Sequence, residues 1–557
     1  MTKMRRFGEG ALAAMLATLA LQASGKSAPG FNVVEASIPQ MQAAMKAGRT
    51  TSHEIVLQYL ARIGAYEDEL HAAVTVNSRA LAEADALDRE RAAGHVRGPL
   101  HGIPIALKDN IMTTALPTSG GMLAFKGYMP PYEATLVKNL EAAGAIIIAK
   151  STLSELAGWY GGGMIASPGG YNAAAGQSYN PYDPRAQADG KPMLAVAGSS
   201  SGVGVAANLW AVNIGTSTGG SIESPSNANM LVGIRPSTGR VSRYGIIPLS
   251  LDQDTAGPMA KTVMDAALVL GALEGDPDPK DPRTTTCKAP PDHDYVRYLK
   301  ADALKGARIG IPRTGIYTTF PVPGGKPTKA LLPEEAQSMN DAIAALKAAG
   351  AEVVTSDLPS TVATDPAHSL PRHSICGLTE SDFLCSDVVR YTMKRDFNLW
   401  LASLGDGRPV KTLTEFLAWN MTHQEEGAIK YGQQRLQMTD QIDLDRDKAR
   451  YEADRASDLR LTREEGLDAA LIGAKVDVVM FPGAGGSNYA TKAGYPIITV
   501  PFGLVTNDNP EAKGSPDKVR PFGVSFVGPL CGEPRLLAIA YGFEQATHRR
   551  VPPPPTP

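Results

Sequence analysis

Two serine- and glycine-rich segments and one lysine carry the residue types that could hydrolyse an amide or an ester. The segments are residues 198–202, GSSSG, and residues 215–221, GTSTGGS, and Lys108 lies upstream of both. A serine hydroxyl is a weak nucleophile at neutral pH, and a lysine can act as its base when burial lowers the lysine pKa. Glycines beside a serine let backbone N–H groups approach a developing oxyanion. The residues therefore predict a serine hydrolase with a lysine base.

The flanking sequence indicates that these segments belong to a folded core. Residues 103–107 form an apolar run typical of a buried strand, so Lys108 would start near the core. Residues 203–209 are apolar and compatible with a helix, and residues 212–215 indicate a short buried strand. Without this context, a Gly/Ser tract is more typical of a flexible linker, and a single lysine of a solvated surface charge. The context favours the catalytic interpretation, because a lysine base requires burial.

In these same residues the chain resembles the amidase signature family. That family carries a lysine in the pattern G-[IV]-P-x-x-x-K-D, followed by G-S-S-[SG]-G and then by G-T-x-T-x-G-S. The resemblance continues through residues 222–236 and 254–259, and residues 241–248 and 493–501 are most similar to the exported bacterial peptide amidases. It implies hydrolysis of a linear carboxamide, such as a peptide C-terminal amide or an aryl or alkyl amide, to an acid and ammonia or an amine.

The resemblance also assigns catalytic roles. It implies that Ser221 is the nucleophile, that Lys108 is the terminal base, and that Ser199 bridges them, with a cis peptide bond between Ser199 and Ser200. Neutral Lys108 would take a proton from Ser199, and Ser199 would take one from Ser221, which attacks the carbonyl and forms an acyl-enzyme. The interval from Ser199 to Ser221 is shorter than is usual in the family, and the shortening fits at residues 203–205.

The oxyanion and the substrate would contact residues around this turn. Thr216 and Ser217 would line or brace the turn, and Ser178 or Asn180 is expected to approach it. Many relatives carry an arginine after Gly-Gly-Ser-Ile, which in some small-acid amidases helps hold a substrate carboxylate, whereas this chain has Glu223. If Glu223 faces the pocket, its charge repels an anionic substrate and favours a neutral or cationic amide. The backbone N–H groups expected to hold the oxyanion belong to Thr218, Gly219, Gly220 and Ser221.

Two other interpretations stay open. Residues 198–202 also fit G-x-S-x-G, the nucleophile elbow of an α/β-hydrolase-type esterase, with Ser200 as the nucleophile. That motif requires a strand directly before it, where only residues 194–197 are apolar, and a histidine, which no sequence context marks. The second interpretation is a catalytically degenerate amide-binding protein of the same fold. The short interval between the serines favours it, and the presence of all three reactive side chains disfavours it.

The N-terminus predicts export. Basic residues at positions 3, 5 and 6 precede an apolar run over residues 11–21, and small residues follow over residues 23–28. This order is typical of a signal peptide, here residues 1–25, and the apolar run is too short to span a membrane in the mature protein. The alternative is a buried N-terminal helix. Export would make the protein periplasmic or secreted, without stable membrane association after cleavage, and would exclude a role in charging transfer RNA.

Composition bears on partners and cofactors. The formal net charge is −3 and acidic and basic residues are interspersed, so nothing indicates a nucleic-acid-binding surface. No cysteine–histidine cluster has metal-ligand spacing, no phosphate-binding P-loop is present, and the predicted chemistry needs no cofactor. Four cysteines, of which Cys376 and Cys385 are the closest pair, allow disulfides in an oxidising compartment, although buried free cysteines are also common.

The elements that would position these residues indicate one large α/β domain, residues 30–548. Residues 36–95 favour helices, and strands alternate with helices from residue 103 past residue 214. Such alternation predicts a sheet with helices on both faces. The resemblance implies the amidase signature fold, in which a large mixed sheet of about eleven strands lies between helical layers.

The second half of the chain divides by composition. A helical, charge-rich and variable section spans about residues 330–475. Late strands are expected at residues 476–482 and 497–500 because these runs are apolar and rich in β-branched residues. The proline-rich tail, residues 549–557, is expected to be disordered or extended.

Overall fold

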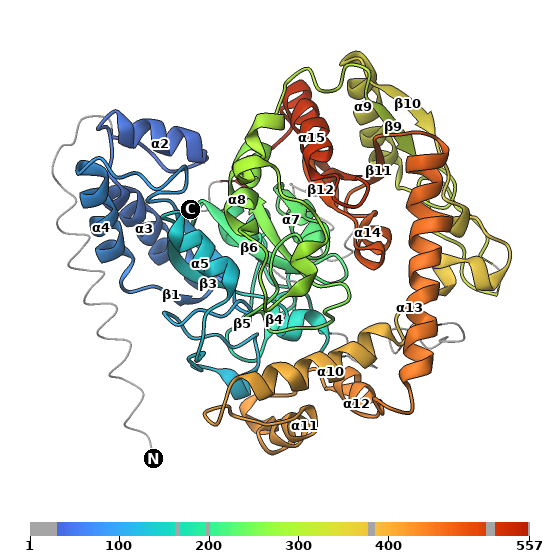
Figure 1. Cartoon of the computed structure of the whole chain (residues 1–557), viewed down its shortest axis with the longest axis horizontal. Helices are drawn as coiled ribbons and strands as arrows, with labels where there is room; N and C mark the ends of the chain where they lie inside the picture. Colours follow the sequence, from blue (N-terminus) through green and yellow to red (C-terminus); the bar gives the residue numbers. More distant parts are fainter. Residues whose placement is uncertain are drawn as a thin grey trace.

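The structure is a computed structural model, and it describes residues 30–161, 167–196, 201–322, 324–376, 385–507 and 519–554. These residues form an α/β domain built on an eleven-stranded sheet (Figure 1). The strands of this sheet are β1 (Ala73–Val76), β2 (Pro104–Lys108), β3 (Ile146–Ser151), β6 (Val212–Ser217), β7 (Val232–Arg235), β8 (Thr255–Ala260), β9 (Arg308–Ile311), β10 (Glu352–Thr355), β11 (Val478–Pro482), β12 (Ile497–Thr506) and β13 (Val519–Val527). A separate two-stranded sheet consists of β4 (Tyr171–Asn172) and β5 (Gly176–Gln177).

Helices surround the large sheet. The first half of the described chain contains α2 (Ile38–Lys46), α3 (Ser52–Leu70), α4 (Ala80–Ala92), α5 (Thr135–Ala142), α6 (Val203–Ala206), α7 (Glu223–Ala228) and α8 (Val263–Glu274). The second half contains α9 (Pro333–Ala348), α10 (Val388–Ser403), α11 (Leu413–Thr422), α12 (Gln434–Asp440), α13 (Lys448–Thr462), α14 (Ser487–Ala493) and α15 (Glu533–Thr547).

The sheet is mixed, and its strand order is β1-β3-β2-β6-β8-β7-β12-β13-β11-β9-β10. β3, β2 and β6 run parallel to one another, as do β11, β9 and β10, and the other neighbours are antiparallel. Because parallel strands point the same way, the C-terminal ends of β2 and β6 lie side by side. Leu107 is paired with Ile214, so Lys108 stands level with the residues that follow Ile214. The register therefore brings the predicted base to the segment GTSTGGS.

β2 lies deep in the sheet. All five of its residues are buried, because β3 and β6 flank it on either side. A strand that is covered on both faces tolerates a continuous apolar run, which the first four residues of β2 provide. The same burial then applies to the fifth residue, Lys108.

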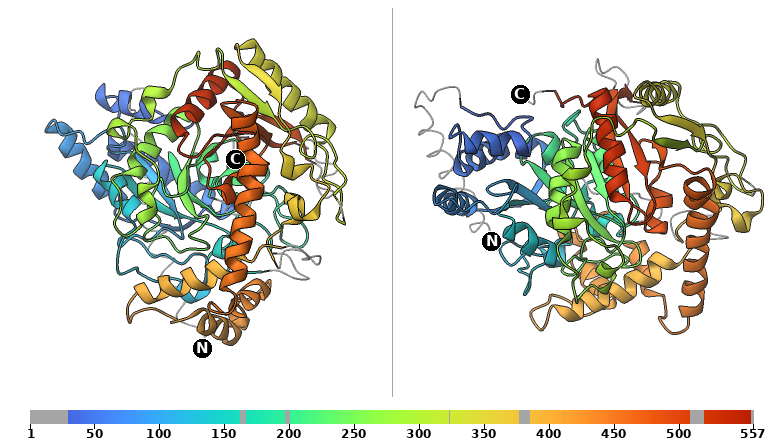
Figure 2. Two further views of the ribbon diagram at one scale, coloured as in Figure 1. Left: turned by 45° about the vertical axis from the view of Figure 1, so that its right-hand side comes forward. Right: turned by 45° about the horizontal axis from the view of Figure 1, so that its top comes forward.

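Two groups of helices have different positions. α5, α8, α15 and α9 contact one another in that order and pack on strands of the sheet, including β8 and β12. The peripheral helices are α10 to α13. In Figure 1, α10 to α12 lie along the bottom of the molecule and α13 along its right side, and in the left view of Figure 2 α13 has come to the front. A hydrophobic cluster that includes Phe397, Trp400 and Phe416 packs α10, α11 and α12 against Leu156 and Ile247.

Two side chains of α10 also form hydrogen bonds with the loop that precedes β8. Asp396 accepts a hydrogen bond from the Leu251 N–H at 2.8 Å, and the Thr392 hydroxyl donates to the Ser250 hydroxyl oxygen at 2.8 Å. Both α10 residues are buried. The conformation of this loop therefore depends on the peripheral helices as well as on the sheet.

The predicted fold class is confirmed, with eleven strands in one mixed sheet. Three local predictions need correction. β1 interrupts residues 36–95, and β10 lies within the helical section 330–475. Both are four-residue edge strands without a fully buried residue, so they lack the apolar run by which a central strand is predicted. α6 covers only part of residues 203–209, since Asn208 adopts a φ of +57° that a continuing helix excludes.

The two ends of the chain differ in what the structure describes. Residues 1–25, the predicted signal peptide, lie outside the described residues. Across the described ranges, no helix has both the length and the apolar content needed to cross a bilayer. At the other end, Arg550 forms an ion pair with Glu35 at 2.9 Å, and the Val551 carbonyl accepts a hydrogen bond from the Tyr182 hydroxyl. Arg550 and Val551 therefore contact the body of the domain, and neither lies in a helix or strand.

Two disulfide bonds connect the four cysteines. Cys376 is bonded to Cys385, the pair that is closest in sequence, and Cys287 is bonded to Cys531. The second bond joins residues 244 positions apart, whereas the first joins residues nine apart. A cross-link restricts the unfolded chain more when it closes a longer loop.

We predict that the two disulfides contribute unequally to stability. In the chain-entropy description, loops of these lengths correspond to about 5 kcal/mol for Cys287–Cys531 and about 3 kcal/mol for Cys376–Cys385. The C287A/C531A double variant should therefore have a lower melting midpoint in calorimetry than the matched C376A/C385A variant. Equal midpoints for the two variants would contradict this ranking.

Candidate active site

Lys108 is a buried lysine at the C-terminal end of β2. Its side chain has no exposed surface, and its Nζ donates to the Thr216 hydroxyl oxygen at 2.8 Å and to the Thr216 carbonyl at 3.2 Å. Asn110 donates from Nδ2 to the same hydroxyl oxygen at 3.0 Å. Burial lowers the pKa of Lys108 to about 7, and the negative charge of Asp254 opposes this shift. A substantial fraction of Lys108 is therefore neutral at neutral pH.

A second buried lysine, on β3, provides a comparison. Lys150 is also fully buried, but its Nζ lies 3.3 Å from a carboxylate oxygen of Asp109, and it donates to the Thr118 hydroxyl at 2.6 Å. Lys108 forms no ion pair with a carboxylate anywhere in the described ranges. A buried ammonium without a carboxylate partner loses more by staying charged. Lys108 therefore loses its proton more easily, and the neutral amine is available to act as a base near neutral pH.

Residues 217–223 form the turn that carries Ser221. The turn begins where β6 ends, at Ser217, and finishes where α7 begins. Gly220 has a φ of +118°, which side chains rarely allow. Gly219 is exposed, and no other group approaches within 4 Å of the position that its Cβ would occupy. Ser221 is partly buried. One face of the turn is therefore open to an approaching molecule.

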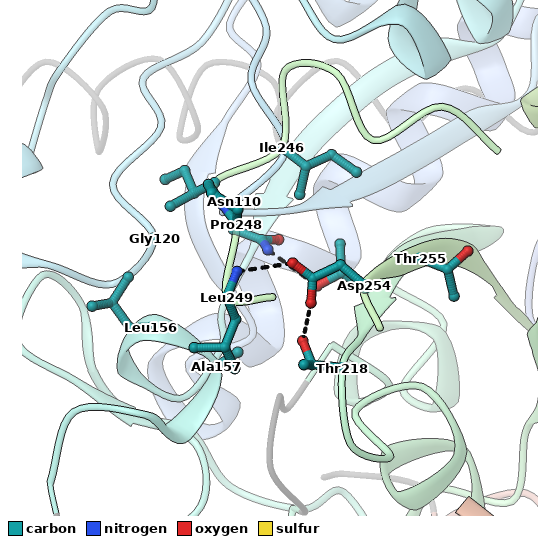
Figure 3. A pocket seen from close by; sticks show the side chains of 12 residues that line it. Asn110, Gly120, Leu156, Ala157, Thr218, Ile246, Pro248, Leu249, Asp254 and Thr255 are labelled. Atoms are coloured by element: carbon teal, nitrogen blue, oxygen red, sulfur yellow. Dashed lines mark hydrogen bonds between the residues drawn. The ribbon is translucent and has the colours of Figure 1, made fainter. Parts of the chain in front are cut away.

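Asp254 fixes the outer part of this turn. Its carboxylate accepts hydrogen bonds from the Thr218 hydroxyl and from the backbone N–H of Leu249, the latter at 2.9 Å (Figure 3). It accepts a third from the backbone N–H of Ser250, also at 2.9 Å. Burial raises the pKa of Asp254 to about 6, although the hydrogen bond from Thr218 acts in the opposite direction. The same carboxylate therefore connects the turn that carries Ser221 to the loop that α10 holds.

A pocket opens beside these groups. One part of its lining is polar, with Asn110, Thr216, Thr218 and Asp254. The rest is mainly apolar, and Figure 3 shows Leu156, Ile246 and Leu249 around the polar group. The remaining lining residues are Gly120, Ala157, Ile247, Pro248 and Thr255. A polar end with apolar walls suits a carbonyl compound with an apolar side group.

Part of the predicted site can be located in the structure. Lys108 meets Thr216, which lies five positions before Ser221 and directly before the turn. Ser199, Ser200 and the cis peptide bond expected between them lie outside the described residues. The oxyanion prediction needs one correction: the Gly220 N–H donates to the Ser217 hydroxyl oxygen at 3.1 Å, inside the turn.

Two predicted substrate contacts are not supported by their positions. Glu223 has no exposed surface and does not line the pocket; its carboxylate accepts hydrogen bonds from the Ser217 hydroxyl at 2.8 Å and the Ile222 N–H at 3.1 Å. The carboxylate of Glu223 faces the inside of the turn and not the pocket. The inference about substrate charge therefore has no geometric basis. Ser178 is fully buried, and its hydroxyl makes no hydrogen bond in the described chain.

Sequence reasoning assigned no role to Asp254 or Asn110. Both lie within segments that carry the family resemblance, which was the signal available. Their partners, Thr218 and Thr216, are distant in sequence and meet them only through the order of β2, β6 and β8. A resemblance shows that such residues belong to a pattern, but it does not show which atoms they contact.

Within the described residues, the site offers little support for an α/β-hydrolase-type mechanism or for metal binding. Residues 191–196 contain no strand, although a nucleophile elbow at Ser200 would need one directly before it. No histidine lines the pocket among the residues that the structure describes. Within those same residues, no group of three or more histidine, cysteine, aspartate or glutamate side chains is arranged to hold a metal ion.

Comparison with known proteins gives a consistent result. The chain is 32% identical over 528 residues to a probable amidase of Arabidopsis thaliana, covering 94% of this chain and 92% of that protein. It is 30% identical over 523 residues to a putative amidase of Arthroderma benhamiae, covering 92% of this chain and 81% of that protein. The solved structure of native peptide amidase from Stenotrophomonas maltophilia is similar with a TM-score of 0.78 and 34% identity, covering 94% of this chain and 99% of that one.

The family model gives the same assignment over most of the sequence. The model described as Amidase matches residues 54–537, a range that includes Lys108, the 217–223 turn and Asp254. Together with the identities above, this match shows that the chain belongs to the Amidase family and is an amide-hydrolysing enzyme.

Proposed function

We propose that the chain is an exported serine hydrolase that cleaves a linear carboxamide through an acyl-enzyme and a Ser–cis-Ser–Lys triad. The observation that carries the proposal is Lys108, a fully buried lysine with a pKa of about 7 and neutral hydrogen-bond partners, at the sheet edge shared with the turn of Ser221. A base that is neutral at working pH is what an unactivated serine nucleophile requires.

The proposed mechanism begins with proton transfer. Ser221 attacks the amide carbonyl as its proton passes through Ser199 to neutral Lys108. The oxyanion that forms is held by backbone N–H groups of the turn, where Gly219 is exposed to the substrate side. The proton then returns through Ser199 to the leaving nitrogen, which departs as ammonia or an amine. Water attacks the acyl-enzyme by the same route and releases the acid.

The proposed substrate is a peptide C-terminal amide or an aryl or alkyl amide. The similarity to the peptide amidase of S. maltophilia over nearly the whole chain supports a peptide amide. The apolar pocket wall, which includes Leu156, Ile246 and Leu249, supports a substrate with an apolar group next to the reacting carbonyl. Partners other than this substrate, including nucleic acid, are not part of the proposal.

Substitution of the three relay residues tests the mechanism. We expect S221A to abolish hydrolysis of peptide amides, and K108A and S199A to lower kcat by at least about 1,000-fold, because members of one proton relay act as a unit. S200A is the matched control for S199A, since it removes the neighbouring hydroxyl. Single-turnover assays on peptide amides, aliphatic amides and anilides provide the measurement. Full activity of S199A combined with loss of activity in S200A would assign the bridging role to Ser200 instead.

The pKa of Lys108 predicts a pH dependence. The neutral amine is the active form, so kcat/KM should be constant above about pH 7 and fall as the pH drops through about 7 and the amine is protonated. D254N removes a negative charge that raises the pKa of Lys108, so it should move this acidic limb to lower pH.

The matched control for D254N is D252N. Asp252 lies two residues away, and it accepts a hydrogen bond from the Tyr451 hydroxyl and lies near the guanidinium groups of Arg395 and Arg455. Its removal should leave the limb in place. An acidic limb that stays fixed or moves upward in D254N would show that the limb does not report Lys108.

The proposed location is the periplasm or the extracellular medium. The N-terminal pattern over residues 1–25 and two disulfides, Cys287–Cys531 and Cys376–Cys385, support it, because disulfides persist in oxidising compartments. We expect the protein recovered from the periplasm or medium of a bacterial host to begin between residues 24 and 26. Mass spectrometry of the intact protein checks this, and an unprocessed chain retained in the cytoplasm would contradict export.

A further inference from the structure

Ser217 and Glu223 close the turn that carries Ser221. The Ser217 hydroxyl donates to Glu223 Oε2 at 2.8 Å, so the side chains of the first and last residues of the turn are joined. The same two groups also accept backbone hydrogen bonds: Gly220 N–H donates to Ser217 Oγ at 3.1 Å, and Ile222 N–H donates to Glu223 Oε2 at 3.1 Å. The pair therefore binds the backbone N–H groups of Gly220 and Ile222, which are every second residue in the latter half of the turn.

Because the N–H groups of Gly220 and Ile222 are bound in this way, the N–H of Gly219 lies in a different environment. The N–H groups of Gly220 and Ile222 are directed to the buried pair, whereas Gly219 is exposed and its N–H has no hydrogen-bond partner in the described chain. Gly220 adopts a φ of +118°, the conformation that lets its N–H turn inward next to an exposed Gly219. An oxyanion needs donors that are fixed in advance toward the position where its charge develops.

On its buried side, the pair interacts electrostatically with Arg235. Glu223 has no exposed surface, and the positive charge nearest in effect is Arg235, whose burial lowers its pKa to about 10 while the charges of Glu223 and Asp254 oppose that shift. Arg235 itself donates to the carbonyls of Gln253 at 2.7 Å and Tyr495 at 3.0 Å. The second carboxylate oxygen of Glu223, Oε1, makes no hydrogen bond in the described chain.

We propose that Glu223 is a positioning residue that acts through Ser217: by holding the N–H groups of Gly220 and Ile222 inward, it presets the N–H of Gly219 toward the oxyanion. The inference rests on the proposed function, because it concerns the same acyl-transfer step. It differs from a substrate-binding role in what it predicts. Loss of the pair should weaken stabilisation of the transition state and leave ground-state binding almost unchanged.

The experiment compares S217A, S217T, E223Q and the S217A/E223Q double variant with wild type. S217T keeps the hydroxyl and serves as the conservative rescue. S226A is the matched control, because Ser226 is a fully buried serine on α7 whose hydroxyl makes no hydrogen bond in the described chain. Each variant is assayed for kcat and KM on a peptide amide. Each is also assayed for inhibition by a peptide aldehyde, which forms an oxyanion with Ser221, and by the corresponding peptide alcohol, which does not.

We expect S217A and E223Q each to lower kcat and the affinity for the aldehyde by roughly 10- to 100-fold, the range for misplaced oxyanion donors. KM and the affinity for the alcohol should stay within about 3-fold of wild type, as for an interaction made only in the transition state. S217T and S226A should retain wild-type kcat. The double variant should lose no more than the worse single variant, because both substitutions break one unit. Melting midpoints confirm that the compared variants are folded.

Other outcomes overturn the inference. Wild-type kcat in folded S217A would show that the pair does not position the turn, and this test does not depend on whether the Glu223 variants fold. A raised KM and a weakened affinity for the alcohol, with kcat retained in E223Q, would return Glu223 to a substrate-binding role. If the wild-type protein hydrolyses no amide and S221A binds the aldehyde equally well, the proposed function fails first and this inference falls with it.

Discussion

The burial of Lys108 is the constraint on which the rest of the site depends. A lysine at the end of a buried central strand cannot reach solvent, and its amine finds only the oxygens of Thr216 as partners within the described chain. Lys150 on the adjacent strand is equally buried, and its amine contacts the carboxylate of Asp109. Lys108 contacts no carboxylate within the described residues, and its burial lowers its pKa to about 7. The order of β3, β2 and β6 enforces this environment, so the chemistry of the amine follows from the position of a strand.

Two buried carboxylates hold the turn from different directions. Asp254 binds the Thr218 hydroxyl and the loop before β8, and Glu223 binds Ser217 from within α7. Between these anchors Gly219 stays exposed. The turn is thus rigid on its buried side and open on its other side. Rigid donors facing an open space are a general requirement for stabilising charge that appears only during a reaction.

Much of this arrangement could be predicted from the sequence. The apolar run of β2, the glycine turn and the late strands follow from local patterns, and the family resemblance supplied the eleven-stranded sheet. The short edge strands β1 and β10 could not be predicted, because their residues are only partly buried and their pairing depends on distant strands.

Glu223 shows why the site itself was harder to predict. Its place next to Ser221 suggested contact with the substrate, but the side chain turns inward to Ser217. Which way a side chain points on the first turn of a six-residue helix depends on the packing of that helix against β7, β12 and β13, and not on the local sequence. The same reasoning applies to Asp254 and Thr218, which lie 36 positions apart.

The hydrogen bonds between α10 and the loop before β8 have a consequence for how the substrate specificity of such enzymes changes. Thr392 and Asp396 fix Ser250 and Leu251, next to the pocket residue Leu249, while Lys108 and Ser221 belong to the sheet and its turn. Changes in the peripheral helices can therefore reshape the apolar wall of the pocket. Because Asp254 links Ser250 to Thr218, the same changes also reach the turn, so natural variation in that section would alter which amides fit together with the anchoring of the turn.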